Sequence, residues 1–375
     1  MRNLTRQKRL TAIAFGWPQP SAETAFDQVV LWNGAMPYAL PFRSLAFVIF
    51  GMVLPCLCVA GTVRISFLTD SPALRDSVQF LQSKGCSQEG VLAFQQAVEC
   101  YVKDKNCPGE RTQAHQKTNE HSGSMMWSLD LSRFPPKNEG SYVFGSAQAL
   151  VRALPHPLAQ TKHEFGINCF DLVILLSDGA LNSNILPDDS GRPFWIPQTT
   201  GENSTTFTVI SKPTAREAFE ICCPAWYREK VDQFMPQQSR DTWICLTPMF
   251  RTFHRLPTST REATLRDNVQ AALQVTWQNA QLTFPTKFQL VLVHDANLSQ
   301  NYFVTAHAGL LFERERGFTY FEKAGGRGPF VRLDLENLTD LEVWLGELAR
   351  LSKEAGSTHY FVTLNDSEIR QLETE

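Results

Sequence analysis

The sequence has almost no excess of charge of either sign, and it lacks the short motifs of several common enzyme classes. Its 375 residues include 35 Lys or Arg and 38 Asp or Glu, which gives a formal net charge of −3. Without a basic stripe, nucleic acid is excluded as an expected partner. The chain also lacks the Gly-x-Ser-x-Gly elbow of serine hydrolases, a phosphate-binding loop and a dinucleotide-binding fingerprint.

The chain also lacks the sequence motifs of common metal sites. The chain contains no His-Glu-x-x-His sequence and no paired Cys-x-x-Cys motifs. A metal site could still be assembled from separate positions, and this alternative would use His163, Glu164, His294, Asp295 and Glu322. We expect no metal and no cofactor.

Only one long apolar run exists, over residues 44–60. Arg43 precedes this run and small residues end it, a pattern typical of a cleaved secretory signal. A membrane-spanning helix usually needs about 20 apolar residues, so the run is short for an anchor. We predict an upstream extension plus signal peptide over residues 1–61, with Met36 as the more ordinary start.

This N-terminal pattern predicts an exported protein, periplasmic or secreted, with no stable membrane span after cleavage. The alternative is a lipoprotein acylated at Cys56 or Cys58. Leucine or proline, and not a small residue, precedes each thiol, which disfavours acylation.

The cysteine count fits export. Without the two signal-segment cysteines, seven remain, and an odd number leaves at least one thiol unpaired in an oxidising compartment. We predict that Cys169 is the free one. Disulfides could join the others in pairings that the sequence does not fix, or all could be reduced core cysteines. These others are Cys86, Cys100, Cys107, Cys222, Cys223 and Cys245.

The rest of the chain, residues 62–375, is predicted to be one domain that starts with a helical part over 62–160. Helices are expected from Ser71, from about Ser87, over Ser146–Leu154 and over Arg261–Gln278, because apolar residues recur there at helical spacing. Polar, proline-rich stretches predict loop insertions over 104–141 and 187–206.

The C-terminal third is predicted to be mostly strands. They are expected over Lys287–His294, Tyr302–Phe312, Phe318–Lys323 and His359–Val362, with a turn at Asp295–Asn297. A capping box at Thr339–Glu342 predicts a helix to about Leu351. Helices followed by an antiparallel meander place the chain in the α+β class, with helices packed on an antiparallel sheet.

A cysteine at the start of an apolar helical run is the strongest chemical signal. Gly166 and Asn168 lead into Cys169, and a helix is predicted over residues 170–178. The free N–H groups of a helix N-terminus favour a nucleophilic thiolate, and those beside Asn168 and Phe170 could also bind an oxyanion. We predict Cys169 as a nucleophile, with a buried structural cysteine as the alternative.

His307 is the one titratable side chain in the apolar strand predicted over Tyr302–Phe312. A hairpin turn centred near Glu315 would place residues 322 and 323 opposite it. The Glu322 carboxylate could then orient the imidazole and stabilise its protonated form. The alternative is a histidine satisfied within the core.

In this order, these residues resemble the NlpC-type papain-like superfamily, mostly amidases and endopeptidases that cut peptidoglycan peptides. More closely, the chain resembles an uncharacterised family of exported bacterial domains of unknown function over about residues 62–350. The matching stretches are Phe67–Asp70, Gly166–Cys169, His307–Leu311, Phe321–Lys323 and Asp340–Leu345. The resemblance implies a papain-like fold, Cys169 as nucleophile, His307 as general base, Glu322 as the orienting residue, and a peptidoglycan or other peptide substrate.

The chain departs from the superfamily at two places. Phe170 and Asp171 stand where a small residue and then glycine are usual, and bulky Phe170 is expected to narrow the site. Glu322 replaces the usual histidine, asparagine or glutamine. The rival hypothesis is a non-catalytic envelope binding domain that keeps the fold, in which Cys169 and His307 need not meet.

Overall fold

The computed structural model describes residues 62–68, 71–106, 141–153, 167–177, 179–191, 193–199, 205–323, 329–351 and 359–372. The predicted signal segment, nearly all of the predicted 104–141 loop, and His163, Glu164, Cys56, Cys58 and Cys107 lie outside these ranges.

The central feature is an antiparallel sheet whose strands come from both ends of the described chain. Nine described strands form it, in the order β13-β12-β8-β9-β10-β11-β1-β2, with β6 paired to β9. Their bounds are β1 (Val63–Phe67), β2 (Ser141–Phe144), β6 (Phe253–Arg255), β8 (Gln289–Asn297), β9 (Tyr302–Glu313), β10 (Phe318–Lys323), β11 (Phe330–Leu335), β12 (His359–Leu364) and β13 (Arg370–Gln371).

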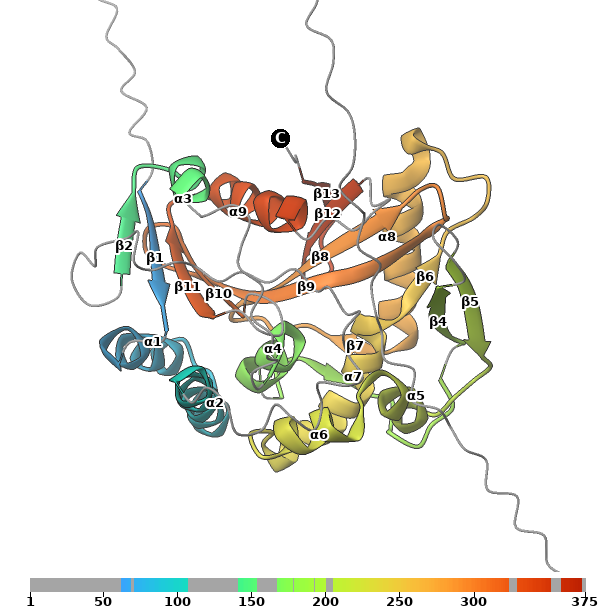
Figure 1. Ribbon diagram of the computed structural model, residues 1–375, viewed down its shortest axis with the longest axis horizontal. Coiled ribbons are helices and arrows are strands. Elements are labelled where there is room, and N and C mark those ends of the chain that lie inside the picture. The colour runs from blue at the N-terminus through green and yellow to red at the C-terminus, as the bar shows by residue number, and fades with distance from the viewer. Residues whose placement is uncertain are drawn as a thin grey trace, which may run out of the picture.

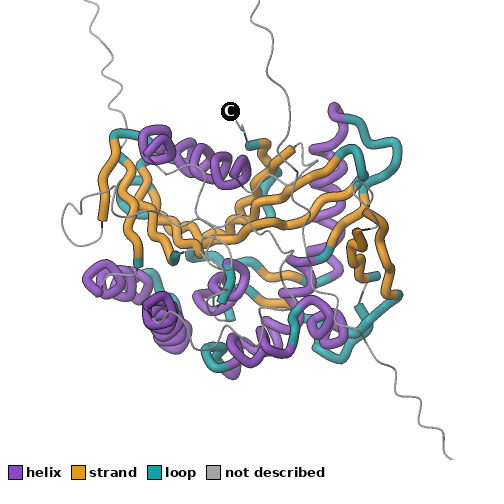
Figure 2. The backbone as a smooth tube through the Cα atoms, viewed as in Figure 1, coloured by secondary structure: helices purple, strands orange, loops and turns teal. Residues whose placement is uncertain are grey.

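Helices cover both faces of this sheet. In Figure 1, α3 and α9 lie above it, and α1, α2, α4, α6 and α7 lie below. Figure 2 shows the strands as a layer between these helices. The bounds are α1 (Ser71–Ser83), α2 (Gln88–Asn106), α3 (Ala147–Ala153), α4 (Cys169–Ser177), α5 (Ala215–Cys222), α6 (Ala225–Asp232), α7 (Arg240–Arg251), α8 (Glu262–Asn279) and α9 (Leu338–Leu351). The α+β class with helices on an antiparallel sheet is confirmed.

A hydrophobic core lies on each side of the sheet. Leu290 and Leu292 of β8 pack in the core that contains α4, whereas Val291 and Val293 pack in the core that contains α9. A central strand with a core on each side has to be apolar on both faces, and β8 is. All nine residues of α4 are buried, which explains why its sequence is apolar all round. None of the described helices is long and apolar enough to cross a membrane.

Several predicted elements are confirmed, but the predicted order of helices before strands is wrong. Helices α1, α2, α3 and α8 and strands β9, β10 and β12 lie where the periodicity placed them. The predicted helical part, however, begins with strand β1, which pairs with both β11 and β2. Strands β1 and β11 are only five and six residues long, and neither was predicted, although apolar and polar residues alternate along them.

Three local predictions need correction. The predicted loop 187–206 contains β4 (Phe194–Thr199), which forms a hairpin with β5 (Thr205–Ile210). Proline in β4 favoured the loop prediction, but a two-stranded ribbon tolerates it at an edge. Residues 295–297 continue strand β8, and the turn follows at Leu298–Asn301. Helix α9 is capped by Asn337, whose Oδ1 accepts from the Asp340 N–H at 2.9 Å.

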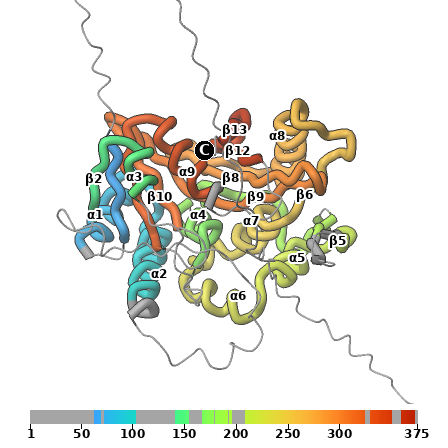
Figure 3. The backbone as a smooth tube through the Cα atoms, turned by 45° about the horizontal axis from the view of Figure 1, so that its top comes forward, coloured from blue at the N-terminus to red at the C-terminus, as the bar shows by residue number. Residues whose placement is uncertain are grey.

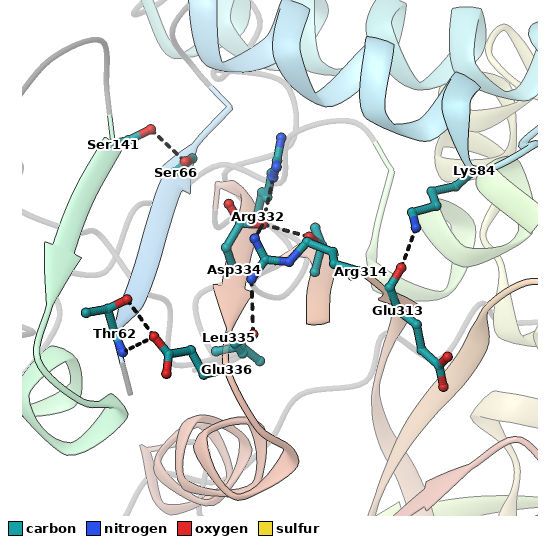
Figure 4. Close-up of polar contacts among 11 residues, drawn as sticks. Thr62, Ser66, Lys84, Ser141, Glu313, Arg314, Arg332, Asp334, Leu335 and Glu336 are labelled. Carbon is teal, nitrogen blue, oxygen red and sulfur yellow. Dashed lines mark hydrogen bonds and ion pairs between the residues drawn. The ribbon is translucent and has the colours of Figure 1, made fainter. Parts of the chain in front are cut away.

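A short two-stranded sheet and a set of polar contacts complete the frame. The short strands β3 (Asn182–Ser183) and β7 (Leu282–Thr283) pair with each other. Around β1 and β11, polar side chains join segments far apart in sequence and also two residues within β11 (Figure 4). The contacts are Thr62 to Glu336 at 2.9 Å, Ser66 to Ser141 at 2.7 Å, Arg332 to Asp334 at 3.2 Å, Arg314 to the Leu335 carbonyl at 3.1 Å, and Lys84 to the Glu313 carbonyl.

Candidate functional site

Cys169 is the first residue of α4, and its position is fixed by a reciprocal cap. The Asn168 carbonyl accepts the first helical bond from Leu172 at 3.0 Å. The Asn168 side chain accepts from the Asp171 N–H at 3.0 Å, while the Asp171 carboxylate accepts from the Asn168 N–H at 2.9 Å. This capping box leaves the first-turn amides of Cys169 and Phe170 without helical partners.

The Asp171 carboxylate is itself held by two buried aromatic residues from other helices. The Tyr227 hydroxyl of α6 donates to Asp171, and the Trp243 indole of α7 donates to it at 2.8 Å. Burial raises the pKa of Asp171, although these hydrogen bonds and the charge of Arg251 oppose the shift. The start of α4 is therefore fastened to α6 and α7 through one carboxylate.

His307 and Glu322 meet across the β9–β10 hairpin. Glu322 lies opposite Gly309, two residues along β9 from His307, and it reaches His307 diagonally on the same face of the sheet. The His307 Nε2 atom is 2.7 Å from Glu322 Oε2. Trp344 of α9 donates its indole N–H to the other carboxylate oxygen at 2.9 Å. Glu322 is 1% exposed, so both of its oxygens find partners inside the protein.

The neighbouring Lys323 points to the opposite face of the sheet. Its side chain is fully buried, and its ammonium group lies 5.1 Å from the Tyr101 ring and 5.3 Å from the Phe330 ring. Such placement over aromatic faces stabilises a cation away from water. Lys323 therefore belongs to the α2 side of the sheet and not to the His307 cluster.

Cys169 reaches His307 at an interruption of the sheet. Two strands pair with the same edge of β9: β10 pairs with residues 309–313 and β6 pairs with residues 302–304. Among the described residues no strand pairs with positions 305–308 on that edge, and the bulge residue Ala306 is exposed. Helix α4 contacts both β9 and β10, and Figure 3 shows it beside them in a second view.

The cysteine and histidine side chains interact directly. Cys169 lies within hydrogen-bonding reach of the imidazole, and because Nε2 faces Glu322, the ring nitrogen left for Cys169 is Nδ1. Burial alone would lower the pKa of His307, but the negative charges of and hydrogen bonds to Cys169 and Glu322 outweigh it. They raise the pKa of His307 to about 10. At neutral pH the imidazole is therefore protonated.

The structure thus brings together three of the predicted site residues and corrects two others. The Asn168 N–H is already bound by Asp171 and by Tyr227 at 3.2 Å, so it is not a free oxyanion donor. The Phe170 ring does not narrow the site, because it stacks in the core on Phe250 with ring centroids 5.5 Å apart.

The metal alternative finds no support in the described part of the chain. No cluster of three or more His, Cys, Asp or Glu side chains with metal-binding geometry occurs there. His294 is fully buried, and its two ring nitrogens contact the hydroxyls of Thr305 at 3.2 Å and Thr363 at 3.1 Å. Burial, and to a smaller extent His254, lower the pKa of His294 to about 3, so the ring is neutral.

All six described cysteines are free thiols, as predicted for Cys169. None of the disulfides considered for the other five therefore occurs among them. These five are Cys86, Cys100, Cys222, Cys223 and Cys245.

Sequence reasoning missed the residues that support the site. Trp344 lies on a helix that begins well after Glu322, and no spacing rule links an indole to a distant carboxylate. Asp171 was noted only as a departure, although an Asn-x-x-Asp spacing before an apolar run is a recognisable cap signal. Tyr227 and Trp243 lie on α6 and α7, which the helical pattern did not predict.

Comparisons with known proteins give one match. A family model described as a domain of unknown function (DUF4300) matches residues 248–369. The matched stretch includes His307, Glu322 and Trp344 but not Cys169. The searches of curated proteins and of solved structures gave no match. The expected resemblance to a family of unknown function is thus supported over this stretch.

Proposed function

We propose that this protein is a cysteine hydrolase that cleaves amide bonds, with Cys169 as nucleophile and His307 and Glu322 as its partners. One observation carries the proposal: a single imidazole touches a helix-N-terminal cysteine on one side and a buried carboxylate on the other. The imidazole, which carries the proton, then lies between the nucleophile and the carboxylate that orients it, which is the arrangement that thiol hydrolysis requires.

The high pKa of His307 assigns its role in the first step. Its positive charge favours a thiolate on Cys169, and the thiolate attacks the substrate carbonyl carbon. The Cys169 amide is placed to donate to the oxyanion, since it has no helical partner. His307 then gives its Nδ1 proton to the leaving amine, and a thioester remains on the sulfur.

In the second step, hydrolysis of the thioester, the proton moves toward His307 instead of away from it. Neutral His307 accepts a proton from water as the oxygen attacks the thioester, and the acid product leaves as the thiolate re-forms. Glu322 holds Nε2–H throughout, so that Nδ1 is the atom that exchanges protons. His307 thus acts as a general acid first and as a general base second.

The interruption of the sheet supports a peptide as substrate. The edge of β9 at positions 305–308 carries backbone groups with no described partner strand, and Ala306 is exposed there. An extended peptide can hydrogen-bond to such an edge beside His307. The resemblance to NlpC-type enzymes further suggests peptidoglycan stem peptides, and the apolar segment at residues 44–60 suggests export to the compartment that contains them. A papain-like fold is part of this proposal.

The test is incubation of the purified protein with peptidoglycan stem peptides, with products identified by mass. We expect amide cleavage by the wild type and a loss of at least about 10³-fold in Cys169→Ala. Cys245→Ser is the matched control, because Cys245 donates to the Ile185 carbonyl from α7 and the serine hydroxyl can also donate. Its rate should equal that of the wild type.

Labelling with iodoacetamide separates the enzyme from the rival binding domain. If Cys169 reacts rapidly but stem peptides are not cleaved, the proposed thiol chemistry stands and the proposed substrate is wrong. A Cys169 that the reagent modifies no faster than Cys245 would reject the hydrolase and leave the binding domain.

A further inference from the structure

Two neighbouring cysteines form a buried cluster that the proposed hydrolysis does not use. Cys222 is the last residue of α5 and Cys223 is its C-cap. Their Sγ atoms are 3.8 Å apart, and the residues are 5% and 0% exposed. The two thiols therefore face each other in a space from which large reagents are excluded.

A cationic side chain lies against this pair. Arg251, at the end of α7, donates from Nη1 to Cys223 Sγ at 3.6 Å. Burial would raise the pKa of Cys222, but the hydrogen bond from Cys223 and the charge of Arg251 outweigh it and lower the pKa below its usual value. The pKa of Cys223 is raised well above its usual value, chiefly because its proton is held by Cys222. The two sulfurs thus lie against each other and beside one cation, whose charge favours the thiolate form of Cys222.

Adjacency makes a bond between these sulfurs easy to form and easy to break. Successive Cα atoms are about 3.8 Å apart, shorter than the separation of about 4.4–6.8 Å in ordinary disulfides. The resulting small ring is strained, and strained disulfides have higher, more oxidising potentials. Such a bond suits reversible chemistry better than permanent cross-linking.

We propose that Cys222 and Cys223 are a redox site that closes reversibly into a disulfide between adjacent residues, with a small peroxide as the oxidant. The Cys222 thiolate attacks one peroxide oxygen, breaks the O–O bond, and becomes a sulfenic acid as hydroxide leaves. The Cys223 thiol then attacks the Cys222 sulfur, forms the S–S bond and releases the hydroxyl group as water. The sulfurs lose two electrons in total, which reduce the peroxide.

This proposal does not rest on the proposed hydrolysis. Cys169 appears in none of its steps, so a failed amide-cleavage assay would leave it intact. Its failure would likewise leave the roles of Cys169 and His307 untouched.

The sequence provides a direct readout. Trypsin releases the peptide Glu217–Arg228, which contains both cysteines and no others. The native protein is treated with hydrogen peroxide, unfolded, and labelled with N-ethylmaleimide before digestion. We expect the peptide to change from two labels to none, lighter than the dithiol by two hydrogen atoms, at least about tenfold faster than the single buried thiol Cys86 loses its label. A mild dithiol should restore both labels.

Two variants test which cysteine is oxidised first. In Cys223→Ser the chemistry should stop at a Cys222 sulfenic acid that dimedone traps, whereas Cys222→Ser should give no such adduct. The wild-type readout stands even if a variant fails to fold. Equal or faster closure in the unfolded chain, linkage of the peptide to the one carrying Cys245, or direct oxidation to sulfinic acid would overturn the proposal.

Discussion

Replacing Glu322 by glutamine tests the core of the proposed site, because the change keeps the side-chain shape and removes only the charge. Trp344 can only donate, so the amide must keep its oxygen toward the indole. The amide NH₂ then faces His307 Nε2, which has to accept instead of donate. Glu322→Gln therefore removes the Nε2 proton and leaves a neutral imidazole with its one proton on Nδ1, the atom that faces Cys169, so the ring can neither stabilise a thiolate nor accept the thiol proton.

The size of the effect follows from the two bonds that hold the carboxylate. If the glutamine amide turns its oxygen toward His307, Nε2 can keep its proton. The buried Trp344 indole N–H is then left unpaired, which costs about 1–3 kcal/mol. Losing the charge-assisted bond to His307 costs a further ~1.5–3 kcal/mol. Together these predict a loss of about 2.5–6 kcal/mol, or about 10²- to 10⁴-fold in rate at ~1.4 kcal/mol per tenfold.

The assay is alkylation of Cys169 by iodoacetamide at about pH 7, because it needs no known substrate and reports the thiolate. Cys245 serves as an internal reference within each sample. We expect Cys169 to react fastest in the wild type and to slow markedly in Glu322→Gln, while Cys245 is unchanged. A Cys169 rate within about threefold of the wild type would refute the role given to Glu322.

The double variant Glu322→Gln/Trp344→Phe checks the tautomer argument itself. Without the indole, the amide is free to turn its oxygen to His307 Nε2, so the correct tautomer returns. We expect alkylation of Cys169 to be faster in the double variant than in Glu322→Gln alone. A purely structural role for Trp344 predicts the reverse, since losing a buried indole would add damage.

Three other changes probe the surroundings. Asp171→Asn should lower the free energy of unfolding by about 3–5 kcal/mol in chemical denaturation, because three donors lose a buried carboxylate. His294 has a depressed pKa, so its contribution to stability is present above pH ~6.5 and is lost as pH falls toward about 3. Between about pH 6.5 and 5 the wild type should lose ~2 kcal/mol more than His294→Gln, measured by unfolding at both pH values; parallel curves would contradict this. Gly309→Ala would drive its Cβ into the Tyr320 side chain and should lower the melting temperature, whereas Gly145→Ala meets nothing within 4 Å and should not.

The sequence predicted the long periodic elements and the pair of elements that carry the candidate site, but not the layers around them. Helices α1, α2 and α8 carry several apolar turns, and the β9–β10 hairpin has a clear turn, so their positions followed from local pattern. The His307–Glu322 contact followed from the turn, although Glu322 pairs with Gly309, two residues from His307. A two-residue offset keeps both side chains on one face of the sheet, where a diagonal neighbour is still within reach of a long side chain.

What the sequence could not supply depends on contacts between distant segments. Trp344 meets Glu322 only because α9 packs on the face of the sheet to which that carboxylate points. Strand β1 joins the sheet between β11 and β2, and nothing local to five residues specifies two partners so far away. Tertiary pairing overrides local preference in such short segments.

The two residues after Cys169 show how a departure from a familiar pattern can be accommodated. A glycine in place of Asp171 could not bind back to the Asn168 N–H, so its cap would have to come from elsewhere. Here the carboxylate supplies the cap, and its burial requires the donors Tyr227 and Trp243. The ring of Phe170 likewise requires an aromatic partner, which α7 provides. Both departures are thus compensated on the side of α4 that faces α6 and α7. The sulfur of Cys169 stays directed at His307, which is why neither departure argues against the proposed chemistry.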